Sequence, residues 1–476
     1  MVEGIEIAEK RRGRPIGVAA RALVREMTDP AAYLSVAARV KYPVGAMLIS
    51  QTALTFGATA VLARALGPQG FGEYALALTI AGIFQLVAAF PVESGIPKFL
   101  AEARSGGAEG EPDGVRGYYT AGLWCRLGAS ALALGWCALG AGWLSARFHA
   151  PALGGPVLIA AIFLCLLTPL NVFFMACIQG MEQPRRWATG NLLSAAAVFP
   201  FLVWGAHGFG RWGQPGLLAL IAAGWLCSAI MCGGLARKAL GSLWPGASAG
   251  PQLRQLVPFL LPMWIVPLAG FGARTIMKLL VAKSSSPVAL GHFEIALTLL
   301  GHMGVVYQAC MIVLLPEWAR LYAGREARQL LTSLARARGV LVGVAMVYGA
   351  ALTLGGQWVV PAIFGREQMG ALPAVRVIGV VMPLMISGWV ASSTNVVSNR
   401  TGNIGKANVI WFSVGVPLSF VLIPPLGALG GALSWLGAYV VFAWYYISRA
   451  RPFFHKVERW AGEGDGIHRR GAEGAE

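Results

Sequence analysis

Charge is scarce in this sequence, and acidic residues are the scarcest of all. Only 12% of the 476 residues are charged, with 21 Asp and Glu against 38 Lys and Arg. An ordinary soluble domain carries roughly 25% charged residues, so that class is excluded. Apolar residues make up 56% of the chain and lie in long runs without alternation. Because lipid confines a chain to helices or a closed barrel, these runs predict an all-α polytopic membrane protein.

Motifs of metalloproteins and nucleotide-driven enzymes are also lacking. The seven cysteines fall in apolar runs without paired CxxC spacing, so we interpret them as small buried side chains and not as metal ligands. No GxxxxGK[ST] motif occurs, and no connection is long enough for a nucleotide-binding domain. We therefore expect no metal and no cofactor. No secretory signal precedes the first apolar run, so we expect the amino terminus to be retained.

The apolar runs predict twelve transmembrane helices. The ninth is the least well defined, because "LGGQWVVPAIFG" (354–365) fits either its end or a separate surface segment. The predicted spans are 43–64, 74–97, 118–143, 156–178, 188–206, 216–236, 256–281, 288–315, 338–363, 374–396, 407–424 and 428–448.

Basic residues are concentrated in every second connection. Most Lys and Arg residues lie in the terminal segments and the even-numbered connections, and the positive-inside rule then places both termini in the cytoplasm. This bias, together with attraction to anionic lipid headgroups, explains the net charge of +17 without nucleic acid as a partner. The odd-numbered connections hold only Arg64, Arg147, Arg211, Lys283, Arg366 and Arg376.

The second half of the sequence repeats features of the first. At an offset of 219 residues, "FGEYALAL" (71–78) aligns with "LGHFEIAL" (290–297), which places Gly72 on Gly291. The offset predicts two copies of a six-helix unit that cross the membrane in the same sense and enclose a central cleft. The predicted parts are a basic amino-terminal segment (1–42), a first lobe (43–236), a cytoplasmic linker (237–255), a second lobe (256–448) and a cytoplasmic tail (449–476). Within the first part, 16–40 fits either an amphipathic surface helix or a disordered tail.

Two motifs carry a family likeness: "LARALGPQGFGEY" (62–74) and "LIPPLGALGGAL" (422–433). With them the sequence resembles the polysaccharide exporters of the multidrug/oligosaccharidyl-lipid/polysaccharide flippase superfamily, which include O-antigen flippases. The resemblance implies a MATE-like fold and alternating access. It also implies export of an undecaprenyl-diphosphate-linked glycan across the bacterial inner membrane. The implied partners are that glycan, membrane lipids, and a polysaccharide polymerase or glycosyltransferases.

Apart from arginines at or near span ends, five charged residues lie inside the predicted spans: Arg274, Lys278, Arg126, Glu93 and Glu294. Each costs at least about 2.5–3.5 kcal/mol there, so each needs a partner or a cavity. Arg274 and Lys278 are four residues apart on one helix face, without an acid in their own span. We predict that they bind the lipid diphosphate in the cleft, with Arg126 as a further candidate. Alternatively, Lys278 and Arg126 extend to the membrane interfaces while Arg274 pairs with Glu93 or Glu294.

Two other functions stay open at this point. A cation-coupled multidrug exporter of the same superfamily would need a buried acid in the first lobe, and Glu93 can serve. A membrane glycosyltransferase or O-antigen ligase would need an acidic catalytic pair, for which the short outer connections offer no good candidates, so no catalytic residue is predicted. No sequence motif identifies the residues that contact a glycan. Polar residues that either line the cleft or join two helices are Gln51, Gln85, Asn171, Gln179, Tyr307 and Gln308.

Overall fold

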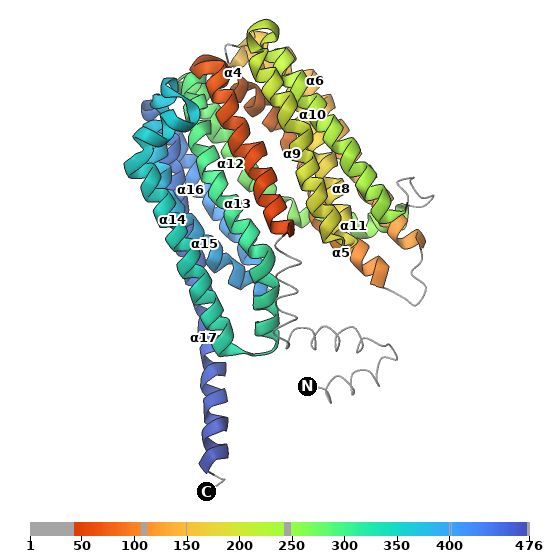
Figure 1. The fold of residues 1–476 in the computed structure, drawn as a ribbon, viewed down its shortest axis with the longest axis vertical. Helices are drawn as coiled ribbons and strands as arrows, with labels where there is room; N and C mark the ends of the chain where they lie inside the picture. The colour runs from red at the N-terminus through yellow and green to blue at the C-terminus, as the bar shows by residue number, and fades with distance from the viewer. Residues whose placement is uncertain are drawn as a thin grey trace.

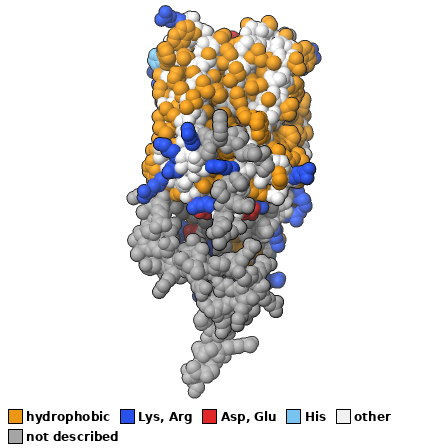
Figure 2. Space-filling model, turned by 90° about the vertical axis from the view of Figure 1, so that its right-hand side faces the viewer, with side chains coloured by type: hydrophobic (Ala, Val, Ile, Leu, Met, Phe, Trp, Pro, Cys, Tyr) orange, Lys and Arg blue, Asp and Glu red, His pale blue; other side chains and the backbone are white. Residues whose placement is uncertain are grey.

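The computed structural model describes residues 42–105, 112–148, 150–241, 249–398, 400 and 402–473, and all regular structure within them is helical. Long helices lie side by side in one bundle (Figure 1). Eleven stretches of the described chain are helical, long and apolar enough to cross a membrane. Apolar side chains cover much of the outer surface, as Figure 2 shows for one face. The amino-terminal surface helix considered for 16–40 lies outside the described residues.

The first half contains α-helices, two short π-helical segments (η1 and η3) and one 3-10 turn (η2). In chain order the elements are η1 (Thr52–Gly57), α4 (Ala58–Ala88), α5 (Val92–Ser105), α6 (Pro112–Arg147), η2 (Pro151–Leu153), α7 (Gly154–Ala161), η3 (Ile162–Leu167), α8 (Thr168–Gly180), α9 (Pro184–His207) and α10 (Phe209–Leu240).

The second half contains longer and less interrupted helices. They are α11 (Gly250–Met263), α12 (Ile265–Ser284), α13 (Pro287–Ala323), α14 (Ala327–Phe364), η4 (Arg366–Ala371), α15 (Leu372–Val397), α16 (Gly402–Leu426) and α17 (Ala428–Glu473).

The first of the eleven stretches holds two predicted spans. It runs from Tyr42 to Arg104, which at about 1.5 Å per residue is far longer than a bilayer core. The chain reverses within it at Gly67, whose φ of 65° favours glycine, and Pro68 begins the next helix. This stretch therefore holds two helices that can cross the membrane, one before and one after the turn. Together with the other ten stretches they make twelve crossings, as the sequence predicted.

One predicted span changes, and the alternative left open for another is decided. The seventh span, 256–281, is not one helix, because the chain bends at Trp264 between α11 and α12, and only α12 (Ile265–Ser284) is long and apolar enough to cross. The segment 354–365 belongs to the ninth helix, since α14 continues to Phe364 and stops at Gly365, where φ is 99°. Its helical hydrogen bonds satisfy the backbone groups that a separate surface segment would expose.

The two ends of the bundle differ in charge. We call the end that carries α5, the α13–α14 connection and the end of α17 the basic end; it lies at the bottom of Figure 1. It holds Lys98, Arg104, Arg185, Arg320 and Arg449 among others. The opposite end, which carries Gly67, Gly213 and η4, is called the far end. Figure 2 shows Lys and Arg side chains gathered where the apolar cover stops, toward the basic end.

The helices form two lobes, the first from η1 to α10 and the second from α12 to α17. They meet where α4 packs against α12 and α13. At Gly72 the contact is between backbones, because a Cβ there would lie 2.2 Å from the carbonyl oxygen of Pro287. Around this crossing, Gln368 donates to the carbonyl of Ala63 at 3.0 Å, and Arg64 donates to that of Ala362. The lobes are therefore joined at the far end.

Candidate functional site

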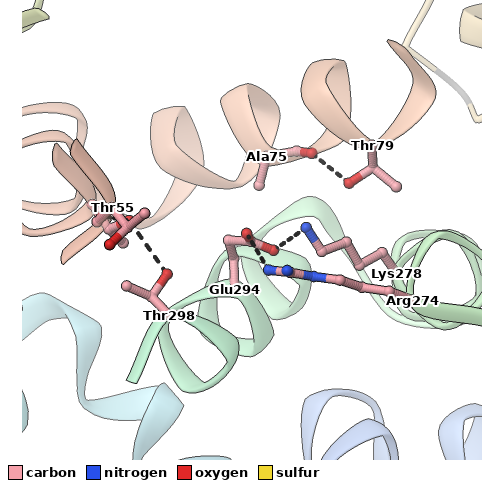
Figure 3. Close-up of polar contacts among 8 residues, drawn as sticks. Thr55, Ala75, Thr79, Arg274, Lys278, Glu294 and Thr298 are labelled. Carbon is pink, nitrogen blue, oxygen red and sulfur yellow. Dashed lines mark hydrogen bonds and ion pairs between the residues drawn. The ribbon is translucent and has the colours of Figure 1, made fainter. Parts of the chain in front are cut away.

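A cluster of three charged side chains lies between the lobes. Glu294 of α13 pairs with two cations of α12: one carboxylate oxygen is 3.4 Å from the Arg274 guanidinium, and the other contacts the Lys278 ammonium (Figure 3). The pairing follows from the helical spacing of the two cations, which turns both toward α13. With two cations and one carboxylate, the charged cluster carries a net charge of +1.

This cluster lines a cavity of about 340 Å³, here called the charged cavity. Arg274 is 38% exposed, whereas Lys278 is 14% and Glu294 21% exposed. Arg274 therefore keeps accessible donors although it contacts Glu294, and a guanidinium can bind a phosphate through two parallel hydrogen bonds. The cluster thus offers an anion both a net positive charge and a directional donor.

Both π-helical segments contribute to the wall of the charged cavity. Thr55 belongs to η1, and Phe163 and Leu164 belong to η3. Near the cluster, the hydroxyls of Thr59 and Thr298 lie 3.3 Å apart and connect the two lobes. Single π-turns inside α-helices are frequent at functional sites, which agrees with a site at this place.

Two further hollows adjoin the charged cavity. A pocket of about 280 Å³, here called the amide pocket, shares Leu54 and Trp225 with it. A larger hollow of about 1060 Å³, here called the entrance cavity, shares Thr168 with it and reaches Gly402 at the start of α16, toward the basic end. We refer to these three neighbouring hollows together as the central cleft. Because the lobes meet at the far end, the cleft lies on the basic-end side of their contact.

Arg126 does not join the charged cluster. Its side chain is 1% exposed and pairs with Glu93, and it also donates to the carbonyls of Ala88 and Phe90. These carbonyls lie where α4 ends before α5 begins, so they lack the helical partners that a continuous helix would supply. Arg126 satisfies them from inside the bundle. It therefore does not extend to the basic edge, and both terminal nitrogens of its guanidinium are already engaged, so we leave it out of the proposed anion site.

The structural alternatives considered for the other two cations are resolved in the same way. Arg274 is paired with Glu294 and not with Glu93, whose carboxylate contacts Arg126. Lys278 does not extend to the membrane interface, because Glu294 holds it at the cavity wall.

Among the candidate cleft residues, Gln51, Asn171 and Gln179 line the amide pocket and Gln85 lines the entrance cavity. Tyr307 instead joins two helices by bonding to Trp389 and Ser393.

The pair of Arg126 and Glu93 yields a stability prediction. Arg126→Ala should lower the free energy of unfolding by about 3–5 kcal/mol, because it leaves the Glu93 carboxylate and the Ala88 carbonyl without their partner in the bundle. The measurement is the melting temperature in detergent together with the amount of protein in the membrane. Arg338→Ala, which removes an exposed arginine at the basic end, is the control. Unchanged melting of Arg126→Ala would show that the pair has no structural role.

Within the described residues, no group of three His, Cys, Asp or Glu side chains is placed to hold a metal ion. The described cysteines are all free thiols, and Cys137, Cys165, Cys177 and Cys232 are buried.

Comparison with known proteins places this geometry in a family. The model of polysaccharide biosynthesis proteins matches residues 44–321, more than half of the chain and including both cations of the cluster. This chain belongs to the polysaccharide biosynthesis protein family. A search of curated protein sequences gave no match.

Solved structures share the fold of this family member at low sequence identity. An inward-facing multidrug resistance MATE family transporter of the MOP superfamily is 13% identical with a TM-score of 0.70, covering 88% of this chain and 99% of its own. An outward-facing MATE transporter is 14% identical with a TM-score of 0.64, over 88% and 96%. The lipid II flippase MurJ is 13% identical with a TM-score of 0.58, over 86% and 89%. The polysaccharide biosynthesis protein thus has the two-lobed fold of MOP transporters.

Several cleft residues of this polysaccharide biosynthesis protein have no signal in the sequence. Tyr74, Trp187 and Trp225 line the cleft although nothing distinguishes them from other aromatic residues in apolar runs. The π-helical turns likewise have no amino-acid composition that distinguishes them from ordinary helix. Asn171 and Gln179 could be suspected, because polar side chains in apolar runs need partners.

Proposed function

We propose that this family member moves a lipid-diphosphate-linked oligosaccharide or polysaccharide precursor from the cytoplasmic to the outer leaflet of the bacterial inner membrane. The observation that carries the proposal is the charged cluster, with net charge +1, on the wall of a cleft between two lobes. Arg274 and Lys278 would hold the diphosphate there. The carboxylate shared by two cations lowers the energetic cost of burying the cluster when no substrate is bound. The cation in excess attracts an anion.

Transport would proceed by alternating access. In the structure the lobes meet at the far end, so a substrate would enter the cleft from the basic end, which we take as cytoplasmic. Opening at the far end would release it outward. A membrane potential that is negative inside favours outward movement of negative charge by about 2.3 kcal/mol per charge per 100 mV. The potential alone can therefore supply a driving force for a diphosphate.

A cation-coupled drug exporter fits the cleft less well. Glu93, the first-lobe acid that this function would need, is paired with Arg126, so no net negative charge is left there for a cation. Drug export predicts that resistance to cationic dyes rises on expression of the chain, whereas glycan export predicts no change. Transfer of glycan by the purified protein in detergent would instead indicate a ligase or glycosyltransferase.

Depletion of the protein in its native strain tests the proposal directly. Surface glycan should fall while the lipid-linked glycan accumulates on the cytoplasmic leaflet, and expression of the wild-type chain should reverse both. Unchanged surface glycan after depletion would contradict the proposal.

The orientation makes a separate prediction. A reporter enzyme that is active only in the periplasm, fused after Glu476, should be silent, because the positive-inside rule places the basic end in the cytoplasm. The same reporter inserted between Gly365 and Arg366, at the far end, should be active. Activity after Glu476 would reverse the orientation.

A further inference from the structure

The amide pocket is lined by hydrogen-bonding groups with no net charge. Gln51, Gln179, Asn191 and Ser194 supply amides and a hydroxyl. The one ionisable group that faces it, Glu93, is neutralised by Arg126. A metal ion or other cation would find no spare negative charge, and an anion no spare positive charge. These walls suit a neutral ligand with several hydroxyl or amide groups.

One wall of the pocket contains an unsatisfied acceptor. Asn171 is 3% exposed, and its amide nitrogen donates to Ser194 at 3.1 Å and to Ser228 at 2.6 Å. Its amide oxygen is buried and has no hydrogen-bond partner among the described residues. A buried acceptor without a donor is unfavourable, and a ligand hydroxyl in the pocket would satisfy it if the side chains around Asn171 moved aside.

Two tryptophans complete the wall. Trp187 and Trp225 line the pocket and are only partly buried, so their rings are accessible from it. Aromatic faces contact the C–H face of a sugar ring, while amides and carboxylates bond to its hydroxyls. With a volume of about 280 Å³, the pocket lies near the lower end of the ligand-site range of about 300–1,000 Å³. It therefore accommodates a single sugar residue and not a long glycan.

The position of the pocket connects it to the charged cluster. Leu54 and Trp225 line both the amide pocket and the charged cavity, so the two hollows are direct neighbours. We propose that the amide pocket binds the sugar residue that is attached directly to the diphosphate, while Arg274 and Lys278 hold the diphosphate. This inference rests on the proposed function and adds the part of the substrate that the pocket recognises.

Photo-crosslinking in living cells tests the contact. p-Benzoyl-phenylalanine replaces Trp187 in the amide pocket, Leu297 in the charged cavity, or Trp204, an exposed tryptophan of α9 outside the three hollows. After irradiation, mild acid cleaves the bond between sugar and phosphate. A crosslink to sugar then keeps glycan on the protein, whereas a crosslink to lipid releases it. We expect retained glycan at position 187 and none at position 204.

The outcomes separate this inference from the function on which it rests. Retained glycan at position 297 but not at 187 would overturn the sugar pocket and leave glycan transport intact. Crosslinked lipid without glycan at position 187 would also overturn it. If neither position 187 nor position 297 captured glycan or lipid, the proposed function itself would be contradicted.

A matched pair of glutamine variants provides an independent measurement. Gln179 lines the amide pocket and its side chain makes no hydrogen bond within the described residues, so Gln179→Leu should fold normally. We expect it to lower the export rate about 3- to 10-fold, the effect of one lost hydrogen bond. Gln308→Leu, an exposed residue outside the three hollows, should leave export unchanged. Equal export by both variants would count against the sugar pocket.

Discussion

Arg274→Ala is expected to abolish glycan export while the amount of protein in the membrane stays near that of the wild type. Lys278 still neutralises Glu294 in this variant, so no charge is left unpaired and folding is spared. The cluster falls from a net charge of +1 to zero and loses its most exposed donor. Losing one partner of a buried charged contact costs about 2–5 kcal/mol, which corresponds to at least about a 30-fold loss of binding.

The amount of surface glycan and the amount of protein in the membrane are both measured for variants of two arginines inside the bundle. Arg126→Ala is the matched control and should show the reverse pattern, with abundance reduced because its contacts are structural. Arg274→Lys should restore export only in part, since it keeps the charge but loses the planar fork. If Arg274→Ala lowered abundance, and Arg274→Ala with Glu294→Gln restored it, the cluster would be a structural ion pair and the diphosphate site would be lost.

Gly72→Leu is expected to stop export by preventing closure of the far end. A Cβ at this position would meet the Pro287 carbonyl at 2.2 Å, and because backbone atoms cannot rotate away, α4 and α13 would have to separate. The lobes would then lose the contact that closes the cleft. We expect export to fall to background, since a transporter that cannot close one side cannot alternate.

Gly82 on the same helix offers the control. A Cβ there would meet only the Thr275 hydroxyl at 3.8 Å, so Gly82→Ala should export normally, whereas Gly72→Ala should already be impaired. Closure can be followed by crosslinking cysteines placed at Arg64 and Ala362, which are in contact in the structure, in a chain whose native cysteines are replaced. Efficient crosslinking in Gly72→Leu would show that the glycine contact is not needed for closure.

The fold could be predicted further than the site. Long apolar runs and alternating basic connections determine twelve crossings, because lipid leaves few alternatives to helices. The bend at Trp264 was missed because both sides of it are equally apolar, so hydropathy gives no boundary there. The end of α14 was left open for the same reason, since Pro361 within an apolar run fits either a helix or a surface segment.

At the site, the sequence identified the charged residues but not their partners. Glu93 and Glu294 are equivalent as partners for Arg274 until the packing of α13 against α12 selects Glu294. Arg126 could not be assigned either, because its role depends on carbonyls freed by the break between α4 and α5, and such backbone groups leave no mark in the sequence. The amide pocket consists of residues from distant helices that only the packed first lobe brings together.

The contact between Gly72 and Gly291 bears on how the chain arose. These glycines are equivalent positions of the two sequence repeats, and a Cβ on Gly291 would lie 3.2 Å from the Cα of Gly72. Equivalent residues of two copies can touch only where the symmetry axis passes between them. A six-helix protein that paired with a second copy of itself in this way would bring this glycine against its twin. In a single chain built from two such copies, the one self-contacting position becomes two that mutate separately, each constrained by the other.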